Sequence, residues 1–159
     1  MRTRVAAVLL LLLALTACSG GNGDDQPGSG KTTDADCAER IPNTVFDTLR
    51  WSPPKAAEAT VSGCHRETEQ GYVEVRDRTG DYDQLCQTLD RSGGVGPGKP
   101  ATWLSGVTAC AVEPEGDVGQ TKVLVKRSGD EVTQVTVVAV DSTDRKDIRA
   151  AVADLVSGG

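Results

Sequence analysis

Residues 120–140 read QTKVLVKRSGDEVTQVTVVAV, and in this segment two apolar-alternating runs flank a short polar turn. Residues 120–126 and 131–140 are rich in valine and threonine, which favour β-strands. Ser128, Gly129 and Asp130 between them are typical turn residues. The pattern predicts two consecutive strands that pair through a tight turn and therefore run antiparallel.

The chain before this hairpin contains three further segments with strand character, at residues 59–66, 71–78 and 106–113. Three helices are indicated by apolar residues at three- and four-residue spacing. We expect them to start at Pro42, at Asp81 with Gln84 three residues on, and at Ser142 or Thr143. The residues expected on their inward faces are Val45, Phe46 and Leu49; Tyr82, Leu85, Cys86 and Leu89; and Ile148, Val152, Leu155 and Val156.

These elements predict an α+β fold with a mainly antiparallel sheet of about five strands and three helices. They occupy residues 37–159, a normal length for one domain.

The N-terminus has the pattern of a secretory signal peptide over residues 1–17: two arginines, an apolar run and small residues. The run is too short for a transmembrane helix, which needs about 20 apolar residues. Leu15, Thr16, Ala17 and Cys18 resemble the lipobox of bacterial lipoproteins, whose cysteine carries diacylglycerol. Cys18 is therefore the expected lipidation site. The alternative is an ordinary secretory signal followed by a chance cysteine.

Residues 18–36 follow as a tether. From Ser19 to Asp36 the residues are small or polar, so the segment cannot bury enough apolar surface to order itself. As a flexible coil it would reach roughly 20 to 25 Å.

Net charge narrows the range of partners. Without Arg2 and Arg4, 15 of the 17 basic side chains remain against 23 acidic ones, a formal net charge of about −8. Such a chain repels nucleic acid and anionic lipid headgroups. We expect its attachment to the extracytoplasmic face of the cell membrane to come from the lipid on Cys18.

Two glycine-rich segments resemble the phosphate-binding loop of nucleotide-binding proteins without meeting its requirements. The sequence GSGKT at residues 28–32 has Asp25 where the first glycine should be, and no strand precedes it. The segment at residues 93–100 has Pro100 in place of the serine or threonine that would hold magnesium. We expect a linker and a turn-rich loop, and no nucleotide.

Four cysteines remain for disulfides: Cys37, Cys64, Cys86 and Cys110. In an exported protein an even set indicates two bridges, with three possible connectivities. Residues 61–69 and 107–115 align at valine, cysteine and two glutamates, and each block follows another cysteine, 27 and 24 residues upstream. The alignment indicates two helix-strand-strand repeats, each closed by its own bridge, and favours Cys37 with Cys64 and Cys86 with Cys110.

The lipobox, the tether, the sequence CAERIPNTVFDTLRW at residues 37–51 and the later GC and AC strands resemble small actinobacterial lipoproteins grouped as domains of unknown function. The resemblance implies an envelope location and a fold type. It implies no reaction.

Residues that carry chemistry are few. The single histidine, His65, adjoins a cysteine expected to be oxidised, and no G-x-S-x-G motif is present. Asp77, Asp81 and Asp83 match no calcium loop, and clustered zinc ligands are absent. We therefore expect no catalytic residues, no metal and no cofactor. Trp51 and Trp103 are the candidate binding residues, with core packing as the alternative.

The sequence thus predicts a non-enzymatic binding or interaction module at the cell envelope, for an envelope protein, an envelope polymer or a small ligand. The second hypothesis is a structural or accessory lipoprotein without a ligand of its own. The third is an exported hydrolase.

Overall fold

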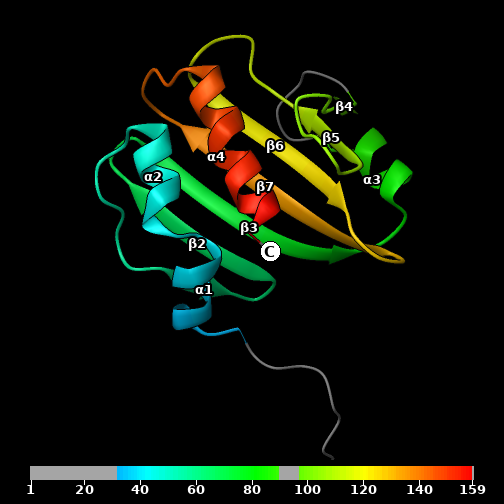
Figure 1. Cartoon of the computed structure of the whole chain (residues 1–159), viewed down its shortest axis with the longest axis horizontal. Helices are drawn as coiled ribbons and strands as arrows, with labels where there is room; N and C mark the ends of the chain where they lie inside the picture. The colour runs from blue at the N-terminus through cyan, green and yellow to red at the C-terminus, as the bar shows by residue number, and fades with distance from the viewer. Residues whose placement is uncertain (1–31, 90–96, 159) are drawn as a thin grey trace, which may run out of the picture. The chain divides into compact units, whose positions relative to one another are not determined.

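The structure is a computed structural model that describes residues 32–89 and 97–158. The signal peptide expected at residues 1–17, the lipidation site Cys18, the tether up to residue 31 and the first part of the second glycine-rich segment lie outside these residues. The described part is an α+β fold with four helices on one seven-stranded antiparallel sheet (Figure 1).

The strands are β1 (Glu58–Thr60), β2 (Gly63–Thr68), β3 (Gly71–Thr79), β4 (Lys99–Pro100), β5 (Ala109–Val112), β6 (Gly119–Lys126) and β7 (Glu131–Ala139). The helices are α1 (Asp34–Arg40), α2 (Asn43–Leu49), α3 (Tyr82–Gln87) and α4 (Arg145–Ser157). The order of strands across the sheet is β1-β2-β3-β7-β6-β5-β4.

The predicted hairpin of residues 120–140 forms the centre of this sheet. Strand β7 pairs with β6 on one side and β3 on the other, and Val135 lies opposite both Val123 and Val75. Gly129 in the connecting turn has a φ of 59°, a conformation that glycine adopts without steric cost. The valine-rich alternation therefore places the most buried strand in the middle of the fold.

The two faces of the sheet are covered unequally. Val123 and Val125 point into the main core beneath α1, α2 and α4, whereas Leu124 between them points to the opposite face. On that face a smaller cluster forms around α3. Figure 1 shows α2 and α4 lying across one face of the sheet and α3 apart from them near β5.

Both disulfides have the pairing that the sequence alignment favours. Cys37 of α1 is bonded to Cys64 of β2, and Cys86 of α3 is bonded to Cys110 of β5. Each bridge fastens a short helix to the sheet, one in the main core and one in the smaller cluster.

Several boundaries differ from the prediction. The strand expected at residues 59–66 is two strands, because a turn at Val61 and Ser62 folds β1 back onto β2. The strand expected at residues 106–113 is limited to β5, and the loop expected at residues 93–100 ends in β4. The sheet therefore has more strands than the five expected.

The helices also differ at their starts. Helix α1 was not predicted; it begins inside the expected tether, capped by Thr33, so the folded domain starts before Cys37. The cap of α4 is Asp144 instead of Ser142 or Thr143, because its side chain accepts a hydrogen bond from the backbone N–H of Lys146. Asp81 caps α3 as expected.

Candidate binding pocket

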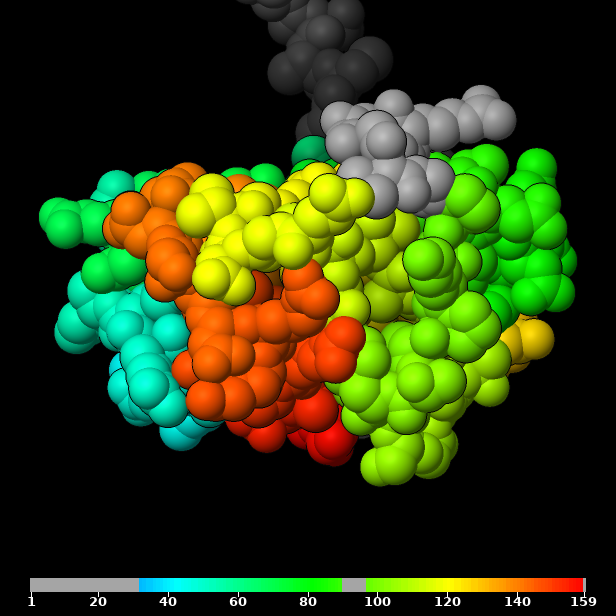
Figure 2. Space-filling model, turned by 90° about the horizontal axis from the view of Figure 1, so that it is seen from above, coloured from blue at the N-terminus to red at the C-terminus, as the bar shows by residue number. Residues whose placement is uncertain are grey.

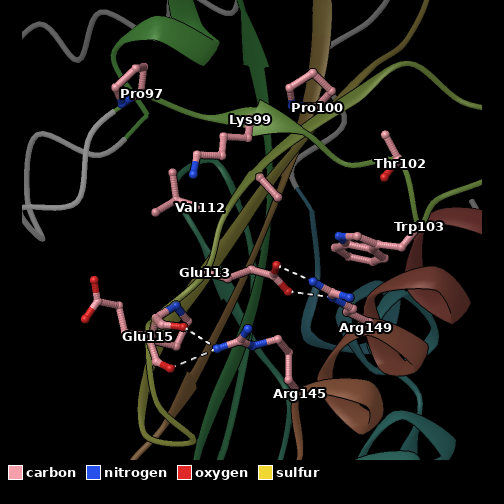
Figure 3. Close-up of a pocket in the computed structure, with 12 residues that line it drawn as sticks. Pro97, Lys99, Pro100, Thr102, Trp103, Val112, Glu113, Glu115, Arg145 and Arg149 are labelled. Carbon is pink, nitrogen blue, oxygen red and sulfur yellow. Dashed lines mark hydrogen bonds and ion pairs between the residues drawn. The ribbon is translucent and has the colours of Figure 1, made fainter.

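A pocket of about 530 Å³ lies where the β4–β5 edge of the sheet meets the first two turns of α4 (Figure 3). Figure 2 shows the light-green residues of this edge beside the orange and red residues of α4 on one surface. The lining residues are Pro97, Lys99, Pro100, Thr102, Trp103, Ala111, Val112, Glu113, Pro114, Glu115, Arg145 and Arg149.

Helix α4 contributes two cations from one flank. Arg145 and Arg149 are four residues apart and therefore lie one above the other on the helix surface. Ile148 and Val152 of the same helix are buried against the sheet, which fixes the rotation of the helix about its axis. Burial of the apolar flank thus presents both guanidinium groups to the pocket.

Trp103 lies in the segment between β4 and β5. Residues 101–104 form a turn that is closed by a hydrogen bond from the backbone N–H of Leu104 to the carbonyl of Ala101 at 3.0 Å. The side chains at its two ends, Ala101 and Leu104, are buried. This anchoring holds the half-buried indole at the pocket wall. The guanidinium carbon of Arg149 lies 5.4 Å from the centroid of the ring, within cation–π range.

Glu113 lies directly after β5 and pairs with Arg149 through two hydrogen bonds. Nε and Nη2 of Arg149 donate to the two carboxylate oxygens, each at 2.7 Å. The side chain of Glu113 is only 18% exposed, so this bidentate pair is partly shielded from water. The hydrogen bond to Glu113 raises the pKa of Arg149 above its ordinary value. The pair holds the guanidinium in a fixed plane beneath Trp103.

Arg145 is held in a different way. Its Nη2 donates to the carbonyls of Pro114 at 2.8 Å and Glu115 at 3.1 Å (Figure 3). Among residues 32–89 and 97–158 no carboxylate pairs with Arg145 or with the exposed Lys99. Arg145 is therefore an oriented cation whose charge no carboxylate of the described chain neutralises.

The charge of the pocket is opposite to that of the whole protein. Of the described residues, three cationic and two anionic side chains line it, a balance of one positive charge, whereas the chain carries a formal charge of −6. A positive pocket in a negative protein favours an anionic group on a ligand.

The two tryptophans that the sequence singles out differ in their environment. Trp103 lines the pocket. Trp51 does not: it is 7% exposed, packs against Phe46 and donates its indole N–H to Thr143 Oγ1 at 3.0 Å. Core packing, the alternative expected for the two tryptophans, therefore describes the position of Trp51.

Sequence reasoning missed the charged residues of the pocket. Arg145 and Arg149 carry no motif, although their four-residue spacing was visible, and Lys99 was seen only as the lysine of the second segment that resembles a phosphate-binding loop. Glu113 was noticed only as part of the repeat alignment. Its partner is 36 residues away, so no local pattern indicates the pair.

The other candidate groups are not brought together into a site. Nε2 of His65 is 3.9 Å from Glu67 and its ring packs against Tyr72. Asp77 pairs with Arg40, and Asp81 caps α3. In the described part of the chain, no three histidine, cysteine, aspartate or glutamate side chains are placed to hold a metal ion.

Comparison with protein-family models, with characterised proteins and with solved structures gives no match for this chain. The resemblance to actinobacterial lipoproteins therefore stays a prediction from the sequence. Across the residues that the structure describes, none of the helices is both long enough and apolar enough to span a membrane.

Proposed function

We propose that this protein is a lipid-anchored binding module at the extracytoplasmic face of the cell membrane, and that the pocket beside Trp103 is its binding site. The observation that carries the proposal is Trp103 itself. It is a half-buried aromatic ring held in place by its buried neighbours, and it lies in a pocket whose Lys99 and Arg145 have no carboxylate partner among the residues that the structure describes.

The pocket has the composition of a small-ligand site. Its volume falls within the roughly 300 to 1,000 Å³ typical of such sites. Proline, valine and tryptophan supply apolar walls, and a few charged groups are placed to orient a ligand. A flat protein contact would not need this concave shape.

The location rests on the sequence. Cys18 would carry the diacylglycerol, and the two disulfides suit an exported protein. The acidic surface disfavours nucleic acid as a partner.

A structural or accessory lipoprotein without its own ligand is the second candidate, favoured by the two disulfides that fasten α1 and α3 to the sheet. An exported hydrolase ranks below it, because His65 does not line the pocket and pairs with Glu67 and Tyr72 instead.

A photo-crosslinking amino acid at Thr102, on the exposed rim of the pocket, tests the proposal in living cells. The matched control is the same amino acid at Thr44, an exposed threonine of α2 that does not line the pocket. We expect a reproducible adduct from Thr102 that is absent from Thr44 and lost in Trp103→Ala. The same adducts from both positions, or none from Thr102, would contradict the proposal.

A further inference from the structure

The hydrogen-bond donors of the pocket are not all in use. Nε and Nη2 of Arg149 already donate hydrogen bonds to Glu113. Arg145 uses Nη2 on two carbonyls, and within the described residues Nε and Nη1 have no partner. The ammonium of Lys99 likewise has no ion-pair partner there. Arg145 and Lys99 are thus the groups with capacity left for a ligand.

We infer that the ligand is an organic anion whose carboxylate is bound by Arg145 and Lys99 while its ring packs against Trp103. This inference rests on the proposed function and names the ligand class for the same pocket. Nε–H and Nη1–H of Arg145 point in different directions, so Arg145 offers one oxygen of the carboxylate a single charged hydrogen bond, and the ammonium of Lys99 supplies the donor for the other oxygen. The orientation of Arg145 is already fixed by the carbonyls of Pro114 and Glu115, so little entropy is lost on binding.

The two carboxylates in the pocket do not oppose this assignment. Glu113 is neutralised by its bidentate pair with Arg149. Figure 3 shows the carboxylate of Glu115 turned away from both arginines. The cations that face the interior therefore outweigh the anions that do.

The apolar residues that line the pocket indicate that the ligand also has an apolar part. Trp103 offers a ring surface, and Pro100 and Val112 line the same cavity. Flat or saturated rings pack well on an indole, and because Arg149 covers one face of the Trp103 ring, the ligand ring would pack on the surface that Arg149 leaves open. A ligand with a carboxylate attached to a ring can contact the cations with its charge and the apolar wall with its ring. An inorganic anion can bind the cations but has no apolar part to pack against Trp103.

Calorimetric titration of the full-length chain in detergent tests this class with matched probes. Phenylacetate and phenylacetamide have the same ring and differ in charge. We expect phenylacetate to bind at least roughly tenfold more tightly, the ratio that corresponds to one charged hydrogen bond. Equal affinities, or no binding of phenylacetate, would overturn the inference.

Three variants test which residues produce the preference for phenylacetate over phenylacetamide. Lys99→Gln, at an exposed position, and Arg145→Gln should each reduce the preference for the acid over the amide several-fold. Trp103→Ala should weaken both probes alike. The control is Lys146→Gln, which neighbours Arg145 but pairs with Asp144 and does not line the pocket; it should change neither affinity. An acid preference that survives in Lys99→Gln and Arg145→Gln would overturn the assignment.

The carboxylate belongs either to an envelope polymer or to a free small molecule. Competition by a soluble polyuronate distinguishes these two sources. Competition between polyuronate and phenylacetate assigns the pocket to a polymer-borne carboxylate, and its absence assigns it to a free small molecule. Both results support the class. If the Thr102 crosslink forms but the acid preference is absent, the ligand class is wrong while the proposed function stands. If the crosslink is absent as well, the proposed function fails.

Discussion

The guanidinium of Arg149 contacts two groups that both attract a cation: its carbon is 5.4 Å from the ring centroid of Trp103, and its nitrogens donate two hydrogen bonds to Glu113. This arrangement joins the end of β5, the start of α4 and the turn that carries Trp103. Arg149 is therefore a positioning residue for the pocket wall, and Arg145 and Lys99 are the cations left for a ligand.

Removing Arg149 should weaken the fold locally without abolishing it. Arg149→Ala leaves the partly buried carboxylate of Glu113 without its donors, at a cost of about 1 kcal/mol after allowance for the 38% exposure of Arg149. Urea unfolding of Arg149→Ala, Glu113→Ala and the double variant should show a coupling energy of similar size. Strictly additive effects would mean that the pair contributes nothing in solution.

Stability should fall in acid partly through Asp77. The hydrogen bonds from Arg40 hold the pKa of Asp77 below its ordinary value of 3.8. A carboxylate with a depressed folded-state pKa adds stability above its unfolded-state pKa, and this stability is lost as the pH falls through the folded-state value. Because the side chain is 63% exposed, the contribution is at most about 1 kcal/mol.

Urea unfolding at pH 7 and pH 3 checks this. The difference in unfolding free energy between the two pH values should be smaller in Asp77→Asn than in the unchanged chain. An equal or larger difference in the variant would show that Asp77 is not part of the acid response.

The two disulfides should protect different parts of the molecule. Replacing Cys86 and Cys110 by serine removes a bridge across 24 residues, worth roughly 3 to 4 kcal/mol, and should release α3 from the smaller cluster. Hydrogen exchange should then accelerate most in residues 82–87. The matched variant, serine at Cys37 and Cys64, removes a bridge inside the main core and should affect α1 and β2. Identical exchange patterns in the two variants would contradict this division.

Thr33 should contribute to the stability of the domain although it lies in the predicted tether. Its Oγ1 accepts from the N–H of Asp36 at 3.2 Å, and the Asp36 carboxylate accepts from the N–H of Thr33 at 2.8 Å. Thr33→Ala should lower the free energy of unfolding by about 1 kcal/mol, measured by thermal unfolding. The side chain of Thr44 caps no helix, so Thr44→Ala should lower it by less than about 0.5 kcal/mol. Equal costs would show that the capping box is not formed.

The sequence predicts well what is local. The hairpin of β6 and β7 has alternating valines and a turn with glycine, so its two strands and their pairing follow from nearby residues. Helix α3 shows its cap and its apolar spacing within eight residues. Helix α1 does not, because Cys37 is its only buried residue. It is held by a disulfide to β2, which helix propensity does not reveal.

The predicted repeat stays a prediction, and the topology is compatible with it. Cys64 lies on the middle strand of β1-β2-β3, and Cys110 lies on the middle strand of β4-β5-β6. The two bridges belong to clusters on opposite faces of the sheet. Repeats arranged in this way would be related by rotation about the central strand β7.

The pocket could not be predicted, for a physical reason. Its charged groups come from segments that meet only after the sheet has formed, and Glu113 and Arg149 carry no motif of their own. Trp103 was found because aromatic residues are scarce, with five in the chain. The same reasoning selected Trp51, because composition does not distinguish a wall of a pocket from a core.

The most direct test of the binding site uses the two indole N–H signals in the NMR spectrum of the tryptophan-labelled chain. Trp51 is an internal reference, because its indole is buried and bonded to Thr143, while the indole of Trp103 faces the pocket. On titration with phenylacetate, we expect a saturable shift of the Trp103 signal with the Trp51 signal unchanged. A stationary Trp103 signal, or equal movement of both signals, would contradict it.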